Sequence, residues 1–194
     1  PSIFLHYFRL RTIIANSQKV QQVKNVISEA FEHIWSNKIS DDGFNKLIIA
    51  SGLSWREIII IRAICKYIRQ TGITYSQSFA EETLVKYTAL PRKFIELFYI
   101  WFDPNFEGNR KDLADELIKE IEYCFTEIKA LAEDIIARKF FDTFKAIVRT
   151  NFFQFNKEGH YKEYISFKIN SSKLPDLPKP IPFAEIFVYS TKFE

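Results

Sequence analysis

The sequence is poor in glycine, and its glycines form none of the loops that cradle phosphate groups. Five glycines occur in 194 residues, and none belongs to a GxGxxG or GxxxxGK pattern. The sequence therefore indicates no nucleotide-binding turn. Few glycines, together with 20 Phe, 9 Tyr and 3 Trp, favour long helices packed through aromatic side chains over a turn-rich β fold. The sequence predicts a mainly α fold.

Long apolar runs, an excess of one charge and paired cysteines are also missing. No run of eighteen apolar residues and no basic segment followed by an apolar one occurs, so we expect no membrane span and no secretory signal. The net charge of +3 comes from basic and acidic residues that are interleaved, which does not favour nucleic-acid binding. Cys65 and Cys124 lie in helical patterns without CxxC spacing, which predicts reduced, buried thiols in a cytoplasmic protein.

Catalytic and metal-binding patterns are missing as well. His6, His33 and His160 are far apart and form no HxxxH or HExxH motif, so a structural or surface role is favoured for each. Asp41 and Asp42 stand where a helix needs N-terminal acceptors, which favours capping over acid–base catalysis. No spacing pairs a nucleophile with a base. We assign no catalytic, cofactor-binding or metal-ligating residue in the chain.

The Ile-rich stretch at residues 55–71 is predicted to be a core helix. Ser54 and Glu57 have the spacing of a capping box, and Gly72 stands where a helix ends. Its polar residues form one narrow stripe, which excludes a bilayer span and indicates one edge in contact with water. We interpret that stripe as a solvated face rather than a track for phosphates. It consists of Arg62, Lys66, Arg69 and Gln70.

Helical periodicity and capping signals predict further helices on both sides of this one. The first covers about 18–36, and a short one runs from the cap at Ser40-Asp41-Asp42 to Ala50. A third covers 79–88 with a capping box at Ser78 and Glu81, and a fourth starts at Pro91 and ends before Asp103-Pro104. Two more lie within 111–150 and are separated near 131–134. One aromatic stripe in this region is interpreted as core rather than as an exposed groove for a partner. It contains Phe94, Leu97, Phe98 and Trp101.

Strand signals appear near both ends of the chain. Residues 3–9 have a β-like composition, 162–170 alternate with the period of a half-buried strand, and 184–190 form another strand after a proline-rich segment. We predict a C-terminal two-strand β element that belongs to a sheet whose other strands lie outside this chain. In this chain its strands should either pair with each other and pack on the helices or recruit the same strands from a second copy. Because the chain starts at Pro1 and contains no Met, we expect it to be a segment of a longer polypeptide.

Several segments of the sequence, in this order, resemble the large NAD-specific glutamate dehydrogenases of bacteria. They are DDGFNKLIIASGLSWREIIIIRAICKYIRQTG (41–72), YSQSFAEETL (75–84), LFYIWFDP (97–104), VRTNFFQ (148–154) and LPDLPKPIPFAEIFVYS (174–190). The resemblance implies a parent enzyme, the longer protein containing this chain, that oxidatively deaminates L-glutamate to 2-oxoglutarate and ammonia with NAD. It also implies that the substrate lysines and the nucleotide-binding part follow Glu194. After Ser190 the chain continues with Thr191 and Lys192, where the family usually has Pro and Arg.

The resemblance also implies a division of the chain. Residues 1–16 correspond to an exit strand and linker from a regulatory domain, 17–151 to a helical domain, and 152–194 to an extended and β segment that leads into the catalytic domain. The chain would then be non-catalytic and would position the catalytic domain against regulatory domains or neighbouring subunits of a homo-oligomer, with no cofactor of its own. The alternative is an independent helical interaction module that binds partners through the aromatic stripe at 94–101.

Overall fold

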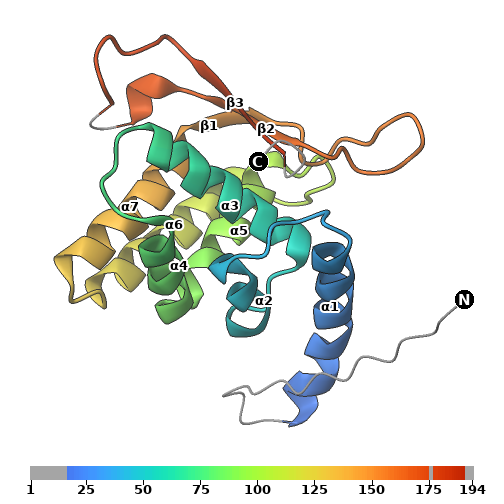
Figure 1. Cartoon of the computed structure of the whole chain (residues 1–194). Helices are drawn as coiled ribbons and strands as arrows, with labels where there is room; N and C mark the ends of the chain where they lie inside the picture. Colours follow the sequence, from blue (N-terminus) through green and yellow to red (C-terminus); the bar gives the residue numbers. More distant parts are fainter. Residues whose placement is uncertain (1–16, 175–176, 191–194) are drawn as a thin grey trace, which may run out of the picture.

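The fold places a small antiparallel sheet across one side of a helical bundle (Figure 1). The structure is a computed structural model that describes residues 17–174 and 177–190, with side chains from residue 24 onward. The predicted strand at 3–9 and His6 lie outside these residues. The described helices are α1 (Ser17–Trp35), α2 (Leu47–Ala50), α3 (Trp55–Gln70), α4 (Gln77–Lys86), α5 (Ala89–Phe102), α6 (Arg110–Thr126) and α7 (Leu131–Ala146). The predicted mainly α fold is confirmed.

The Ile-rich segment forms α3, and its predicted capping box is present. The Glu57 backbone N–H donates to the Ser54 hydroxyl at 3.3 Å, and the Ser54 backbone N–H donates to the Glu57 carboxylate at 2.7 Å. Ile60 and Ile64 are fully buried, as a core helix requires. Gly72 has φ of +88°, which lets the chain turn away after the last helical turn. Local signals are therefore sufficient to define this helix.

The sheet contains three strands where two were predicted. They are β1 (Ile147–Thr150), β2 (Ile165–Ile169) and β3 (Glu185–Tyr189), in the order β1-β2-β3 with both pairs antiparallel. The prediction that the last helix continues to residue 150 is wrong, because the backbone becomes extended at Ile147. Ile147 and Val148 are β-branched, so pairing with β2 outweighs a weak helical tendency.

The start of α4 also differs from the prediction. Ser76, and not Ser78, caps this helix, because its hydroxyl accepts from the Phe79 backbone N–H at 3.2 Å. The helix begins two residues earlier than expected and ends at Lys86. Glu81 is consequently not a capping-box partner, and its carboxylate accepts from the Gln77 side-chain amide at 2.8 Å. Only Ser78 has an acidic residue three positions later, so the sequence pattern pointed to it, whereas the structure uses Ser76 as the cap.

Helices and strands share one hydrophobic core. The inner face of the sheet contributes six buried side chains to the same cluster as α3, α5 and α7. They are Ile147, Ile165, Phe167, Ile169, Phe187 and Tyr189. The strands therefore pair with each other and lay their apolar face on the helices, which is the first of the two arrangements predicted. The predicted division of the chain at 151–152 runs through this core and stays a prediction.

The capping box and the core of α3 can be separated by mutation. Ser54→Ala should lower the free energy of unfolding by about 1 kcal/mol through the lost cap. Ile60→Asp and Ile64→Asp should each cost several times more, because each buries an unpaired charge. Urea unfolding followed by circular dichroism measures all three. Similar small losses in the three variants would show that α3 is not at the centre of the core.

Candidate functional site

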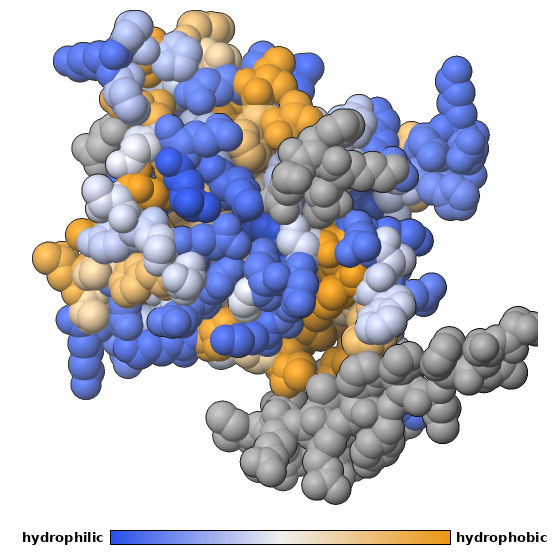
Figure 2. Space-filling model, in the orientation of Figure 1, coloured by the Kyte–Doolittle hydropathy of each residue, from blue (hydrophilic) through white to orange (hydrophobic). Residues whose placement is uncertain are grey.

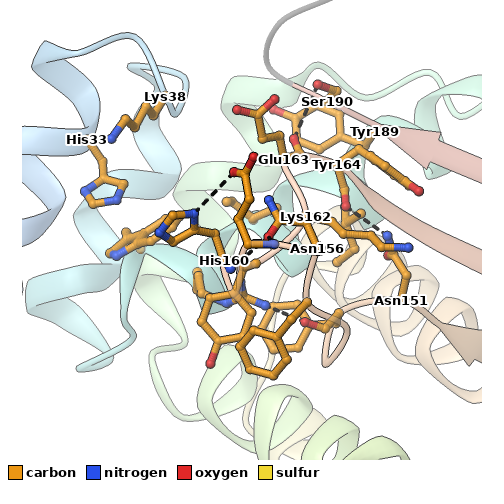
Figure 3. A pocket seen from close by; sticks show the side chains of 18 of the residues that line it. His33, Lys38, Asn151, Asn156, His160, Lys162, Glu163, Tyr164, Tyr189 and Ser190 are labelled. Carbon is orange, nitrogen blue, oxygen red and sulfur yellow. Dashed lines mark hydrogen bonds and ion pairs between the residues drawn. The ribbon is translucent and has the colours of Figure 1, made fainter.

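A hollow on the described surface lies where α1, α3 and the segment 151–165 meet (Figure 3). Its volume is about 850 Å³. His33 and Lys38 line it from the end of α1 and the loop that follows, and Arg56 lines it from the first turn of α3. Basic and aromatic side chains around one hollow suggest a site for an anion, so the partner of each cation decides whether that reading holds.

Arg56 is engaged by the protein itself. Its guanidinium carbon lies 3.3 Å from the centre of the Tyr161 ring and 4.3 Å from that of Phe152, and it donates a hydrogen bond to the Phe152 carbonyl. Burial lowers the pKa of Arg56 from its ordinary value. Phe155 stacks on Tyr161 with 4.6 Å between ring centres. Arg56 therefore clamps the projecting segment 151–162 onto α3 instead of facing a ligand.

The remaining cations and histidines of the hollow also have partners. Lys162 Nζ donates to Gln154 Oε1 at 3.0 Å, and His160 Nδ1 lies 3.8 Å from Glu158 Oε2. His33 stacks on Trp55 with 4.0 Å between ring centres and bonds a backbone carbonyl of its own helix. Within residues 17–174 and 177–190, no three His, Cys, Asp or Glu side chains gather as metal ligands. The hollow is thus a seam between elements held by internal contacts.

The interpretation of Arg62 as part of a solvated stripe is wrong. Its side chain is fully buried and binds Asp42 with both ends of its fork: Nε to Oδ2 at 2.6 Å and Nη2 to Oδ1 at 2.8 Å. Nη2 also donates to Asn45 Oδ1 at 3.0 Å and to the Ser40 carbonyl. Asp42 serves as the predicted cap as well, since it accepts from the Phe44 backbone N–H. Arg69 is exposed, as expected of a solvated stripe.

The pair extends into a network that ties three segments together. The Gln77 side-chain amide at the start of α4 donates to Glu81 at 2.8 Å and to Asp42 Oδ2 at 3.3 Å. Glu81 lies so close to Gly43 that a Cβ at residue 43 would be 2.4 Å from its carboxylate oxygen. A side chain at residue 43 would make the Glu81 carboxylate move, so glycine is favoured there by close approach and not by an unusual backbone angle. The network fixes the turn after α1, α3 and α4 relative to each other, which is a structural role.

The aromatic stripe at 94–101 is core, so the groove expected by the alternative reading is not on the surface. Phe94 packs between Phe141 and Phe144 of α7, with ring centres 5.9 and 5.4 Å away. Phe98 contacts Phe152 and Phe167 across the helix–sheet boundary. Trp101 is half-buried. The stripe holds α5 against α7 and the sheet, as the core reading predicted.

The two cysteines differ in exposure. Cys65 is buried in α3, and burial raises the pKa of its thiol to about 12. A thiol that stays protonated is a poor nucleophile and a poor metal ligand, so Cys65 has a packing role. Cys124 is only half-buried, in contrast to the prediction. Both are free thiols, as expected.

On the outer face of the sheet, strand β3 carries two neighbouring apolar side chains that are exposed. Ile186 and Val188 of β3 are 76% and 57% exposed, whereas Phe187 and Tyr189 point inward and are buried. Figure 2 shows apolar surface over this upper part of the molecule. Neighbouring exposed apolar residues on one strand are typical of a surface that is covered by another segment. This face and edge of β3 form the candidate interaction site. The sequence analysis predicted a strand at 184–190 that would seek a partner, but not which of its edges and faces would be uncovered.

Comparison with known proteins places this architecture in a class of enzyme segments. A family model described as glutamate dehydrogenase, helical motif 3, matches residues 39–104. A second, described as bacterial NAD-glutamate dehydrogenase, catalytic domain, matches residues 120–194. The first match contains α2 to α5 and the second runs from within α6 through β3, so both correspond to parts of one enzyme class. The chain belongs to the family of NAD-specific glutamate dehydrogenases of bacteria.

Three curated relatives are each named NAD-specific glutamate dehydrogenase. The protein of Halomonas elongata is 34% identical over 193 residues, covering 100% of this chain and 12% of its own length. Those of Pseudomonas aeruginosa and Mycobacterium tuberculosis are 35% and 32% identical, over 90% and 86% of this chain and 11% and 10% of their own lengths. The chain therefore spans about a tenth of the length of these relatives.

The described residues offer no cradle for a dinucleotide. The four glycines with positive φ, at positions 52, 72, 108 and 159, stand singly in turns. None forms the glycine-rich turn that leads from a strand into a helix and receives a pyrophosphate. None of the described helices is both long and apolar enough to cross a membrane.

The buried ion pair makes a strong prediction for stability. Asp42→Ala should lower the free energy of unfolding by about 3–5 kcal/mol, because Arg62 is left as a buried charge without its counterion. Adding Arg62→Met should recover much of that loss. The matched control is Glu120→Ala, which breaks the partly exposed pair with Lys93 and should cost no more than about 1 kcal/mol. Equal losses for Asp42→Ala and Glu120→Ala in urea unfolding would contradict the central role of the pair.

The buried thiol predicts how stability changes in alkali. Below pH 9 Cys65 is protonated in both states, so its contribution is fully present there. Above pH 9 the unfolded thiol ionises while the folded one, with a pKa of about 12, does not. Stability should then fall by up to about 1.4 kcal/mol per pH unit from this group.

Cys65→Ala should therefore flatten the fall in urea midpoint between pH 8.5 and pH 11, and Cys124→Ala should not. Burial also raises the pKa of Tyr99, to about 12, so every variant keeps some loss of the same sign. The comparison between the two cysteine variants isolates the contribution of Cys65. Identical pH profiles for the two variants would show that the folded Cys65 thiol ionises normally.

Proposed function

We propose that this chain is a non-catalytic segment of an NAD-dependent glutamate dehydrogenase and that it positions the catalytic domain of the parent enzyme. The parent would deaminate L-glutamate to 2-oxoglutarate and ammonia, with NAD accepting the hydride. The observation that carries the proposal is the single core shared by the helices and the sheet, since β1, β2 and β3 lie in the catalytic-domain match and rest on α3 and α5.

The packing supports a rigid connection between the helices and the sheet. Phe98 of α5 contacts Phe152, Phe153 and Phe167, so aromatic rings from the helical part and the sheet interdigitate. Arg56 adds a polar clamp between α3 and the Phe152 carbonyl. Interiors packed in this way transmit displacement instead of absorbing it. A movement of the helices relative to other domains or subunits would therefore carry the sheet along with it.

The NAD and glutamate sites are proposed to lie in parts of the parent outside this chain. This assignment is supported by the absence of a glycine-rich strand-to-helix turn among the described residues and by the internal pairing of basic side chains in the hollow between α1, α3 and 151–165. We further propose a homo-oligomeric parent in the cytoplasm. Its other domains are then the partners of this segment, and neither nucleic acid nor membrane is among them.

The alternative, an independent helical interaction module, has less support. Its binding groove was expected along the aromatic stripe, and Phe94 and Phe98 are fully buried. The match to consecutive parts of one enzyme class also favours a segment with a fixed place in a larger fold.

The proposed function can be tested with two proteins. The 194-residue chain should show no binding of NAD by calorimetry and no glutamate-dependent NADH absorbance. The parent enzyme, produced from its complete reading frame, should reduce NAD in the presence of glutamate. Saturable micromolar binding of NAD to the chain would contradict the non-catalytic assignment, and a parent without this activity would contradict the assigned reaction.

A further inference from the structure

The backbone of β3 has a free edge whose residues can be identified from a hydrogen bond elsewhere in the sheet. The Ser166 N–H donates to Asn151 Oδ1 at 2.7 Å, and its carbonyl accepts from the Asn151 N–H at 3.4 Å. Both backbone groups of Ser166 therefore point toward the β1 side of β2. In an antiparallel ladder, hydrogen-bonded and non-hydrogen-bonded pairs alternate along the strand. The residues on either side of Ser166, Ile165 and Phe167, must then point toward β3.

The register of β2 and β3 extends this result to β3. Phe167 is opposite Phe187, so these two residues exchange backbone hydrogen bonds. Ser166 and Lys168 are opposite Val188 and Ile186, which form the non-bonded pairs. The backbone N–H and C=O groups of Ile186 and Val188 consequently point away from β2. Among the described residues no strand pairs with β3 on that side.

This edge lacks the features that normally protect an unpaired strand. Charged side chains, prolines and bulges discourage pairing with foreign strands. Ile186 and Val188 are exposed and apolar, and the Glu185 carboxylate accepts a hydrogen bond from Ser171 Oγ at 2.9 Å instead of standing on the edge. The opposite edge strand, β1, has an exposed Arg149 and an irregular register between Ile147 and Arg149. One edge of the same sheet is protected, and the other is open.

We propose that the free edge of β3 receives a β-strand from the catalytic domain of the parent polypeptide, a segment outside these 194 residues. Its backbone would bond with Ile186 and Val188, and apolar side chains on its outer face would pack beside theirs. This inference rests on the proposed function. The occupant is assigned to the parent because β3 lies within the catalytic-domain match and because about nine-tenths of each relative lies outside the matched segment.

Amide hydrogen exchange tests the proposal, because β3 carries its own internal control. In the 194-residue chain the Phe187 amide should exchange slowly and those of Ile186 and Val188 quickly. In the parent enzyme, measured by mass spectrometry with residue-level fragmentation, the Ile186 and Val188 amides should exchange at least about tenfold more slowly than in the chain. Fast exchange at both residues in the parent would overturn the proposal. Protection that already appears in the chain and grows with its concentration would overturn it in favour of a second copy.

Substitutions separate pairing at the edge from a general loss of stability. Val188→Pro removes only an N–H that faces away from β2, so the chain should keep its thermal midpoint. The same variant of the parent should lose the protection at Ile186. Val188→Lys should have the same effect, whereas Val148→Lys, the matched change on the exposed face of β1, should leave that protection intact.

Loss of protection in all three variants of the parent, or in none of them, would overturn the assignment to the β3 edge. The exchange readout does not depend on turnover. A parent that protects Ile186 but does not oxidise glutamate would contradict the proposed function alone, and an active parent with unprotected Ile186 would contradict the inference alone.

Discussion

The ion pair between Arg62 and Asp42 is the interaction on which the arrangement of the helices depends. A guanidinium removed completely from water is tolerated only when its charge is paired, and here a bidentate carboxylate pairs it while Nε and Nη2 donate to that carboxylate, an amide oxygen and a backbone carbonyl. These acceptors belong to the turn before α2, so that turn can occupy only one position against α3. Gln77 extends the constraint to α4. Buried polar networks of this kind specify one arrangement among several that an apolar core would accept.

Signals confined to neighbouring residues were sufficient for much of the fold. The capping box at Ser54 and Glu57, the apolar faces of α3 and α5, and the stop before Asp103-Pro104 all act within one or two turns, and the structure contains each of them. The mainly α class follows from such local preferences. They are readable because they involve the same few residues in the sequence and in the structure.

The features that the sequence did not predict depend on partners distant in the chain. Arg62 occupies a position compatible with a solvated stripe, and only the approach of Asp42, twenty residues earlier, makes it buried. β1 has a helix-compatible pattern and becomes a strand because β2 is available to pair with it. The free edge of β3 could not be predicted either, since strand order and register determine which backbone groups remain unpaired. Chain-distant pairing, and not local propensity, decided each of these cases.

The contact between Gly43 and Glu81 also restricts how the sequence can evolve. Any side chain at residue 43 would collide with the Glu81 carboxylate and displace it from Gln77, so the two positions are coupled although they lie 38 residues apart. An alanine at 43 can be accommodated when the Glu81 carboxylate moves away or when residue 81 is shorter, and either route gives up the hydrogen bond from Gln77. The two substitutions share this loss, so their effects on stability should not be additive.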